Sequence, residues 1–437
     1  MKSSMLLYSL PLLLLISLSF NYYIIVYILP GLPILGKPYS QSLHINISWS
    51  QPLTNTCNQH DKKILLNMKN IMGKPTSLTS WDTITDCCLQ WDGIRCDEHG
   101  HVVSLHISNI DEYHHCHIPP LLNELSWLTE LYFTDSPGLF GLIPSSISKL
   151  TNLTKFVIFR TNVSGPVPNF LGQLIKLKVL NLSGIKLTGP IPIFLKRLKS
   201  LDHLDLSSNR LMGPIPDFLS QLKSLTYLDL SNNKLTGPIP LGLAQLKNLI
   251  VLSLGSNKLS GQIPEFLGRE LKSISTIKLE SNRFSGQIPT SLGQPSNLTT
   301  ISLSDNQLIG LIPRSLGSIY RDKLALDNNK LTGDASFLFD VSQLSINNNL
   351  LKFDFSNVNL GLLLWSFNIS HNMIYGSLPE WFGQIDFMYH VDVSYNQLCG
   401  PIPNGQRFKQ VDPLKFAHNK CLCCGPLPAC KRWWMLS

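Results

Sequence analysis

The sequence has little charge, and the whole middle of the chain lacks cysteine. Charged residues make up 15% of the 437 residues, and residues 117–398 contain no cysteine. No stretch combines clustered Lys and Arg with aromatic residues, which excludes nucleic acid from the expected partners. No segment after residue 36 is apolar for long enough to cross a bilayer. The formal net charge of +8 points instead to anionic surroundings such as an acidic polysaccharide.

Long apolar runs occur only at the N-terminus. Lys2 precedes the run Met5–Phe20, which has the polarity and length of a secretory signal. A second apolar stretch, Tyr22–Leu35, makes the pair long enough to span a bilayer, although Asn21 and several prolines interrupt it. We therefore expect residues 1–36 to be a signal peptide or a signal-anchor-like segment, followed by an unstructured leader at 37–56. The chain is expected to be secreted, with membrane association as the alternative.

The ten cysteines form one cluster near each end of the chain, which agrees with export because disulfides persist in oxidising compartments. We expect four disulfides, although the sequence alone does not fix their connectivity: Cys57–Cys87, Cys88–Cys96, Cys399–Cys421 and Cys423–Cys430. Cys116 and Cys424 are left over, and they lie too far apart to pair with each other.

The middle of the chain repeats one unit of 24 residues. Leu201–Ser224 and Leu225–Asn248 are nearly identical, and an apolar-Pro step returns every 24 or 25 residues from Pro144 to Pro313. The unit reads LxxLxLxxNxLxGxIPxxLxxLxx, a leucine-rich repeat. Alternation within Leu204-Asp205-Leu206 sends the leucines inward and the intervening residues outward, as a strand requires. One coil cannot bury enough apolar surface to be stable alone, so consecutive coils must stack.

Two further positions of the unit have structural roles. An asparagine three residues after the last strand leucine can bond to the backbone of neighbouring coils. The glycine before each Ile-Pro step suits a sharp bend. We therefore predict an α/β fold: a right-handed leucine-rich-repeat solenoid, a horseshoe or superhelix, with a concave parallel β-sheet and disulfide-stapled caps. The predicted parts are an N-terminal cap at 57–100, about 12 coils at 101–403, a C-terminal cap at 404–430 and a tail at 431–437.

Several motifs resemble a known family. The segments CNQHDKKILLNMKN and SWDTITDCCLQWDGIRC look like the N-terminal cap of plant extracellular leucine-rich-repeat proteins. Irregular repeats in the second half resemble polygalacturonase-inhibiting proteins: Lys330–Phe339, Asn348–Val358, His371–Pro379, Val393–Gly405 and Phe416–Cys430. Cys424 departs from this pattern because the family has Gly there. The resemblance implies a secreted cell-wall defence protein, without catalytic activity or cofactor, that binds pathogen endopolygalacturonase through its concave sheet.

The outward positions of the strands are the candidate partner-binding residues that this resemblance implies. They are Phe159, Arg160, Asn181, Asp202, His203, Asp205, Tyr227, Asp229, Val251, Ser253, Lys278 and Glu280. Asp202, Asp205 and Asp229 form an acidic group beside Phe159 and Tyr227, which we expect to be exposed and able to anchor a basic enzyme cleft. The plainer interpretation is that these positions are only polar and solvated.

Asp205 and Asp229 also invite an enzymatic interpretation. They occupy equivalent places on adjacent strands, about 5 Å apart, close to the separation in retaining glycosidases. We expect an open, wet face neither to raise a carboxyl pKa nor to enclose a sugar, so no enzyme is predicted.

Histidines crowd the first coils, at His99, His101, His106, His114, His115 and His117, with Cys116 between the last two. Metal binding is one interpretation. A solvated loop is the other and is preferred, because adjacent ligands in HHCH cannot all face one ion. No metal is therefore predicted.

Six N-x-S/T sequons occur. Asn152 and Asn297, just before strands, are the expected glycan carriers in a secreted chain. Asn162 is expected at the buried ladder position, where a glycan would conflict with packing.

The protein partner implied is polygalacturonase, and pectin is a second expected partner because Lys and Arg are spread outside the concave face. The protein is expected to be a monomer. A ligand-binding ectodomain or truncated receptor-like protein of the plant leucine-rich-repeat class is the first alternative. A structural or ice-binding wall protein is another, but the mixed charge and aromatics of the outward positions do not favour it.

Overall fold

The computed structural model describes residues 56–317, 321–359, 361, 363–384, 389–405 and 411–430. The expected signal or anchor segment at 1–36, residues 37–55 of the expected leader and the tail at 431–437 lie outside these residues. Among the described helices, none combines the length and hydrophobicity needed to cross a bilayer.

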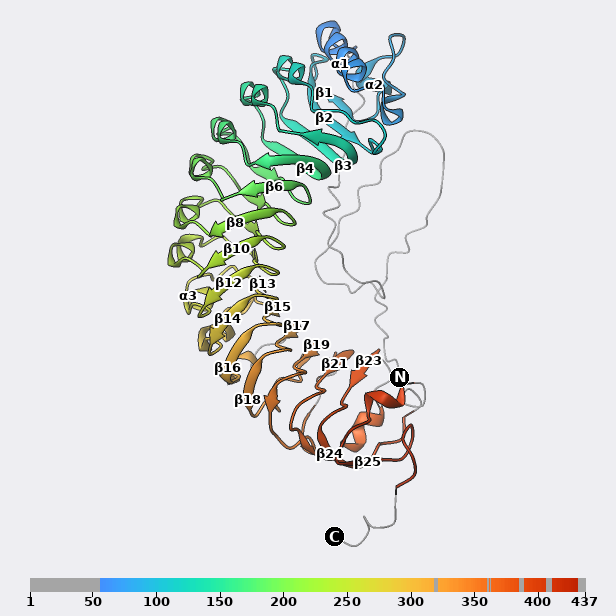
Figure 1. Cartoon of the computed structure of the whole chain (residues 1–437), viewed down its shortest axis with the longest axis vertical. Coiled ribbons are helices and arrows are strands. Elements are labelled where there is room, and N and C mark those ends of the chain that lie inside the picture. The colour runs from blue at the N-terminus through green and yellow to red at the C-terminus, as the bar shows by residue number, and fades with distance from the viewer. Residues whose placement is uncertain are drawn as a thin grey trace, which may run out of the picture. The chain divides into compact units, whose positions relative to one another are not determined.

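The repeats fold into a solenoid with parallel strands along its inner edge and short helical segments along its outer edge (Figure 1). This confirms the predicted leucine-rich-repeat fold. The inner strands are β2 (Val102–Ser108), β3 (Glu130–Gly141), β4 (Lys155–Pro166), β5 (Val179–Asn181), β7 (His203–Asp205), β9 (Tyr227–Asp229), β11 (Val251–Ser253), β13 (Thr276–Lys278), β15 (Thr300–Ser302), β17 (Arg321–Ala325), β19 (Val341–Ser345), β21 (Ser366–Asn368) and β23 (His390–Asp392). We call the surface of these strands that faces away from the leucine core the concave face.

A second row of parallel strands follows the inner row, and most of its strands end at, or one residue after, the glycine of the sharp bend. Its members are β6 (Lys186–Gly189), β8 (Arg210–Pro214), β10 (Lys234–Gly237), β12 (Lys258–Gly261), β14 (Arg283–Gly286), β16 (Gln307–Leu311), β18 (Lys330–Gly333) and β20 (Leu350–Leu351). The far half of β4 pairs with β6, so β4 belongs to both rows. Three more strands, β22 (Tyr375–Gly376), β24 (Gln397–Pro401) and β25 (Cys421–Cys423), form a separate sheet.

Short helices complete the coils because the Ile-Pro step ends the extended backbone and starts a turn. They are η2 (Pro120–Glu124), η3 (Ser145–Lys149), η4 (Asn169–Gln173), η5 (Ile193–Arg197), η6 (Asp217–Gln221), η7 (Leu241–Gln245), α3 (Phe266–Arg269), η8 (Thr290–Gly293), η9 (Arg314–Gly317) and η10 (Glu380–Gln384). The glycines at the bend have positive φ, for example +83° at Gly213 and +77° at Gly237, which a side chain disfavours.

The core is a stack of repeat leucines. Leu204, Leu206, Leu228 and Leu230 are 0% exposed, so each strand sends its leucines inward as predicted. Every second residue of the strand is thereby left on the concave face.

The ladder asparagines bond between coils as predicted. The side-chain amide of Asn209 donates to the carbonyl of Leu182 at 2.7 Å, and its oxygen accepts from the N–H of Leu187 at 2.9 Å. The ladder also continues into the C-terminal cap at Asn419, beyond the repeats predicted at 101–403.

The ends of the array are capped. In the N-terminal cap, α1 (Gln59–Ile71) is followed by η1 (Thr76–Leu78), α2 (Cys87–Gln90) and β1 (Ile94–Cys96), which pairs antiparallel with β2. Ile64, Leu65, Met68 and Met72 are buried. In the C-terminal cap, η12 (Pro413–Lys415) precedes β25. The structure contains the four expected disulfides, Cys57–Cys87, Cys88–Cys96, Cys399–Cys421 and Cys423–Cys430, and leaves Cys116 and Cys424 free.

Candidate binding surface

The register of the inner strands aligns the candidate residues in columns. Asn181, Asp205, Asp229, Ser253 and Lys278 form one column, each paired with its neighbour in the next coil. Neighbouring members lie about 4.8 Å apart because they share a parallel ladder. The column therefore places two carboxylates next to each other on the concave face.

The expected acidic group is only partly exposed. Asp202 is exposed, whereas Asp205 is 6% exposed and Asn181 is 6% exposed. Asp205 accepts a bond from the N–H of Ser207 at 2.9 Å and one from the side-chain amide of Asn181 at 3.2 Å. The expectation that Asp205 faces solvent was wrong, because its carboxyl caps its own backbone turn and lies between neighbouring members of the column.

Burial, and next the negative charge of Asp229, raise the pKa of the Asp205 carboxyl to about 6. The expectation that this face cannot raise a carboxyl pKa was therefore also wrong. The same burial removes Asp205 from contact with a substrate. The pair consequently lacks the two accessible carboxyl groups that glycoside hydrolysis requires.

Aromatic side chains lie beside this pair. The rings of His203 and Tyr227 stack at 4.0 Å with 11° between their planes. The hydroxyl of Tyr227 donates to Asp229 at 3.3 Å. Burial lowers the pKa of His203 and raises that of Tyr227. Tyr227 is half-buried, as is Phe159, so the expectation that both are exposed was wrong.

In the central part of this face, around β7 to β13, two polar atoms have no hydrogen-bond partner among the described residues. They are Nε2 of His203 and Oε2 of Glu280, and both are buried. Glu280 follows Lys278, and both side chains are half-buried. Because buried polar atoms are normally paired, these two atoms are suited to accept or donate a bond to a group that approaches the concave face.

The remaining candidates extend the surface in both directions. Arg160 is exposed, lies 5.0 Å from the ring of Phe159 and pairs with Asp135 at 3.4 Å. Val251 is half-buried, whereas Ser253 is 4% exposed. The surface is thus a mixture of charged, aromatic and aliphatic groups.

A column of stacked rings lies at the C-terminal end of the array. His371, Tyr395 and His418 stack with 4.1 Å between successive ring centroids. Tyr395 and His418 were not among the expected surface residues. The signal was present in the sequence, since each of the three residues directly precedes a ladder asparagine. Exposed Trp365 and Tyr389 directly precede the inner strands β21 and β23, and their ring centroids are 6.3 Å apart.

The histidines of the first coils do not form a common set of ligands. His114 bonds to Asp111 at 2.9 Å, and His106 bonds to Thr134 at 2.8 Å. Within the described ranges, groups of three potential metal ligands occur only among cysteines, at Cys57, Cys87 and Cys88 and again at Cys423, Cys424 and Cys430. His114, His115 and His117 lie in the loop between β2 and η2, whereas His106 lies on β2 and is half-buried, so the expectation of a solvated loop was wrong for His106.

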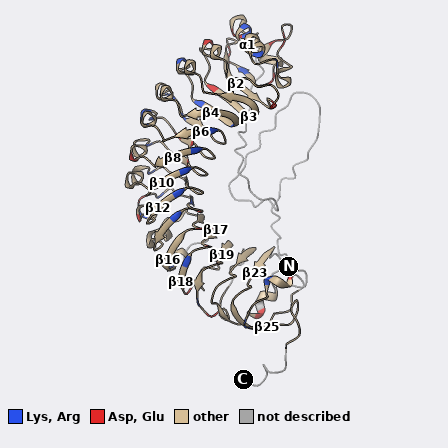
Figure 2. Ribbon diagram, viewed as in Figure 1, with Lys and Arg blue, Asp and Glu red and all other residues tan. Residues whose placement is uncertain are grey.

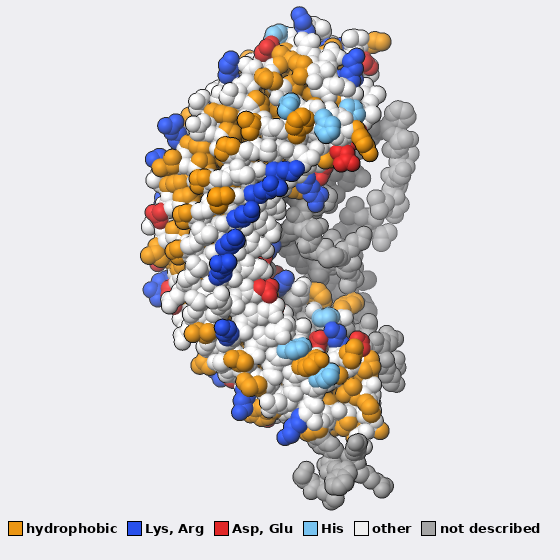
Figure 3. Space-filling view, viewed as in Figure 1, with side chains coloured by type: hydrophobic (Ala, Val, Ile, Leu, Met, Phe, Trp, Pro, Cys, Tyr) orange, Lys and Arg blue, Asp and Glu red, His pale blue; other side chains and the backbone are white. Residues whose placement is uncertain are grey.

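A row of cations crosses the second row of strands. Lys186, Arg210, Lys234, Lys258 and Arg283 each begin a strand and are exposed. Figure 2 shows these positions in blue along β6 to β14, and Figure 3 shows a diagonal line of Lys and Arg side chains. We call these five residues the basic row. Within the described residues, no acidic side chain forms an ion pair with any of them.

The diagonal arises from the strand register. Thr188, and not Lys186, lies opposite Arg210, and the next three strand pairs have the same shift of two residues. Each step therefore moves about 4.8 Å across the strands and about 6.6 Å along them. Successive cations are about 8 Å apart, and the row is about 33 Å long by the same strand geometry.

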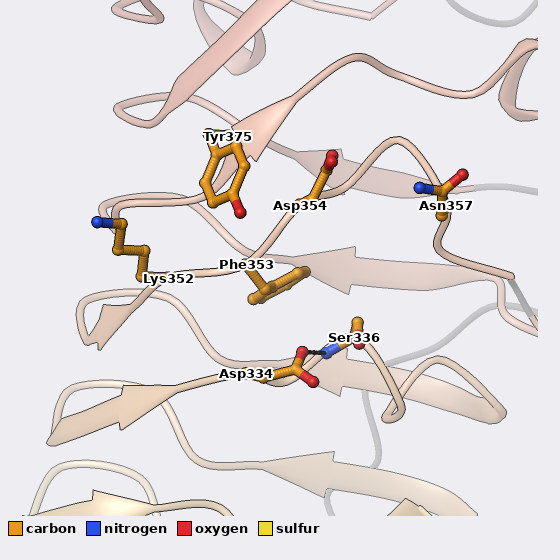
Figure 4. Close-up of a pocket in the computed structure, with 7 residues that line it drawn as sticks. All are labelled: Asp334, Ser336, Lys352, Phe353, Asp354, Asn357 and Tyr375. Atoms are coloured by element: carbon orange, nitrogen blue, oxygen red, sulfur yellow. Dashed lines mark hydrogen bonds between the residues drawn. The ribbon is translucent and has the colours of Figure 1, made fainter.

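A shallow depression of about 380 Å³ opens where the second row of strands is interrupted. An isolated bridge between Asp354 and Tyr375 joins the two sides of this gap. Figure 4 shows Phe353 at its centre, with Tyr375 above it and Asp334 below. Lys352, Ser336 and Asn357 also line it. It was not predicted from the sequence and lies outside the concave face.

The sequons differ in exposure. Asn297 is exposed. Asn152 is half-buried and donates to the carbonyl of Ser126 at 3.1 Å. The expectation for Asn162 was wrong: Thr161 occupies the ladder position and is 5% exposed, while Asn162 is half-buried beside it.

The family model for the leucine rich repeat N-terminal domain matches residues 58–97, and leucine rich repeat models match 175–235, 223–269 and 297–319.

Among curated sequences, polygalacturonase inhibitor 2 of Arabidopsis thaliana is 42% identical over 113 residues, which cover 25% of this chain and 34% of that protein. The polygalacturonase inhibitor of Pyrus communis is 37% identical over 110 residues, which cover 24% of this chain and 33% of that protein. The chain thus spans about a third of the length of these relatives.

Among solved structures, the ectodomain of the plant membrane receptor kinase GASSHO1/SCHENGEN3 from Arabidopsis thaliana is 29% identical, with a TM-score of 0.57. The match covers 72% of this chain and 38% of that one. That ectodomain was solved in complex with CASPARIAN STRIP INTEGRITY FACTOR 2.

Proposed function

We propose that this chain, a leucine-rich-repeat protein similar to plant polygalacturonase inhibitors, is secreted to the plant cell wall and inhibits a pathogen endopolygalacturonase. The similarity to several inhibitors at 35–42% identity supports this function most directly. The concave face would inhibit the enzyme by covering its cleft, and this chain would catalyse no reaction itself.

The central part of the concave face is the proposed contact surface. Asp202 is exposed there, the stacked pair His203 and Tyr227 is half-buried, and Glu280 has a carboxylate oxygen without a partner among the described residues. Aromatic side chains contribute strongly to protein interfaces, and exposed carboxylates attract a basic partner. Asp205, in contrast, is assigned a structural role because it is buried.

The test is a titration of the secreted protein into a panel of endopolygalacturonases, with release of reducing ends as the measurement. We expect inhibition of at least one enzyme, and Tyr227→Ala should weaken it about tenfold or more, as for an interface anchor. Leu241→Ser is the matched control, because Leu241 is 74% exposed on η7, on the outer edge of the solenoid. If a correctly folded protein inhibits no enzyme in the panel, the function is that of a receptor-like ectodomain or of a copy without a partner.

A ligand-binding ectodomain remains the second candidate function. The similarity to a receptor-kinase ectodomain over 72% of this chain favours it. Cell fractionation distinguishes the two: retention of the intact N-terminus in membranes supports the receptor, and recovery of the processed protein in the wall supports the inhibitor.

Pectin is the proposed second partner, and the basic row is its proposed site. De-esterified pectin is a linear polymer with a carboxylate on every sugar, so a line of five exposed cations without acidic partners matches its charge. Such binding is electrostatic and should weaken as salt screens the charges.

Elution from immobilised de-esterified pectin by salt tests this site. Lys258→Gln should lower the eluting salt concentration and weaken binding about fivefold, since one cation near an anionic surface is worth about 1 kcal/mol. Lys247→Gln is the control, because Lys247 already pairs with Glu270 at 2.6 Å. An equal effect of the two substitutions would remove the basic row from the proposal.

A further inference from the structure

The C-terminal cap holds three cysteines in one cluster. The sulfur atoms of Cys423, Cys424 and Cys430 all lie within 4.8 Å of one another. A disulfide joins Cys423 to Cys430, and Cys424 is free and half-buried. The Sγ atoms of Cys424 and Cys430 are 2.6 Å apart, little more than a disulfide bond length of about 2.05 Å. Cys430 is therefore within bonding reach of both neighbours.

The backbone holds this arrangement in place. Strand β25 pairs with β24, and the disulfide Cys399–Cys421 fixes it there. After the strand, the N–H of Cys424 donates to the carbonyl of Pro428 at 2.8 Å, and the N–H of Leu427 donates to the carbonyl of Cys424 at 2.9 Å. This turn returns the chain so that Cys430 lies against the end of β25.

Cys424 has a conformation that a side chain rarely adopts. Its φ is +69°, in the left-handed region that favours glycine. A glycine at this position would give the turn the same backbone without strain. The cysteine adds a thiol to the turn, directed at the sulfur of Cys430.

The second free cysteine, Cys116, is buried and lies far from this cluster. Cys116 is 4% exposed, and burial raises the pKa of its thiol to about 11. It lies near the opposite end of the solenoid, in the coil that leads into β3 (Figure 1). A buried thiol that stays protonated is a poor nucleophile, so Cys116 provides an internal control for any reaction of the chain with disulfides.

We propose that Cys423 and Cys424 alternate as the disulfide partner of Cys430. Whichever of the two is not bonded to Cys430 has a free thiol, and this thiol forms mixed disulfides with low-molecular-weight disulfides. In the internal step, the thiolate of Cys424 attacks Sγ of Cys430. The Cys424–Cys430 bond forms, the Cys423–Cys430 bond breaks, and Cys423 leaves as a thiolate that takes up a proton. The step is an exchange without net oxidation, so it needs no oxidant.

The external step uses whichever thiol is free at that moment. That thiolate attacks one sulfur of a small disulfide, forms one protein–small-molecule disulfide and releases one small thiolate. The cap can therefore take up one adduct while keeping one disulfide to Cys430. This inference depends only on the three cysteines and is independent of the proposed inhibition of an enzyme.

Fragment-ion mass spectrometry of the full chain tests the internal step. The folded protein is alkylated without reduction and digested, and fragment ions between residues 423 and 424 locate the alkyl group. We expect two populations, one with Cys423 alkylated and one with Cys424 alkylated. A single population with Cys424 alkylated, unchanged after prolonged incubation at neutral pH, overturns the exchange.

Glutathione disulfide as a probe tests the external step. We expect wild type and Cys116→Ser each to gain one glutathionyl group at the cap. Cys424→Ser keeps the disulfide between Cys423 and Cys430, so it should gain none at the cap. An adduct on Cys116 in wild type that disappears in Cys116→Ser, with none at residues 423 or 424, overturns the proposal.

Cys423→Ser provides the strictest comparison. Its remaining pair, Cys424 and Cys430, should form a disulfide and leave no alkylatable thiol in the cap. If Cys424 and Cys430 are both alkylated in this variant, the two sulfur atoms do not reach each other and the exchange is refuted. Should this variant fail to fold, the wild-type fragment map and the Cys424→Ser reaction still decide the question.

Discussion

Replacement of Asp205 by Asn should stabilise the protein at neutral pH. The Asp205 carboxyl is buried, and its pKa is raised from 3.8 to about 6, mainly by burial. Between these two values the folded state binds more protons than the unfolded state, so stability falls as pH rises. The contribution of this group is fully present below about pH 4 and lost above about pH 6.

The expected magnitude follows from the size of the shift. A shift of about two pKa units corresponds to about 3 kcal/mol at about 1.4 kcal/mol per unit. The Asn oxygen can still accept from the N–H of Ser207, but the bond from Asn181 is lost because both side-chain groups become donors. That loss costs about 1 kcal/mol. The net gain at neutral pH is therefore about 2 kcal/mol.

Urea unfolding followed by tryptophan fluorescence, at several values between about pH 4 and about pH 7, measures this effect. The difference between Asp205→Asn and wild type isolates the one carboxyl: it should grow by about 3 kcal/mol across this range. Leu241→Ser, at an exposed position on η7 that does not titrate, is the control and should give a nearly constant difference. A variant difference that is flat with pH, or that turns unfavourable at neutral pH, refutes the reasoning.

Two other substitutions test the coil structure and the cap. Asn233→Ala should cost about 1–3 kcal/mol in urea unfolding, because it leaves the buried N–H of Leu211 without its acceptor. The carbonyl of Leu206 also loses the bond from Asn233 but keeps the one from Asn209. Asn248→Ala, which removes one exposed bond, should cost less than about 1 kcal/mol, and equal costs would contradict the ladder's role. Cys424→Gly should raise the thermal midpoint, since it removes left-handed strain of about 1 kcal/mol, and a lower midpoint would contradict this assignment.

The fold could be predicted because every coil repeats the same pattern of leucine, asparagine and glycine. The leucine alternation at Leu204 and Leu206 sets the inner strand, and Asn209 satisfies the backbone of the turn that follows. These requirements are local and recur with a fixed period, so the sequence specifies the stacking and the outward positions together. Disulfides were expected at the two ends because the cysteines cluster there, but the sequence alone does not fix which cysteines pair.

The burial of individual surface side chains could not be read from the period. Asp205 and Asp229 occupy the same place in the repeat, yet Asp205 is 6% exposed and Asp229 is half-buried. The difference depends on the neighbours in the next coils, Asn181 and Ser253, and on the bond from Asn181. The cations of the basic row recur at one repeat position in the sequence. The diagonal direction of the row, in contrast, depends on the shift of two residues between strands, which no single repeat contains.

That shift has a consequence for how the surface could lengthen. Because each of these five coils displaces its cation by the same shift of two residues, the charges follow one line with a nearly constant interval. Insertion of one more 24-residue unit that carries Lys or Arg at this position would add one charge and one interval. The next strand of the row, β16, begins with Gln307 and ends the line. Loss of a unit would shorten the line by the same amount. The number of consecutive repeats that carry this cation thus sets the length of the basic row along a rod-like polyanion. That number can be counted in the sequence.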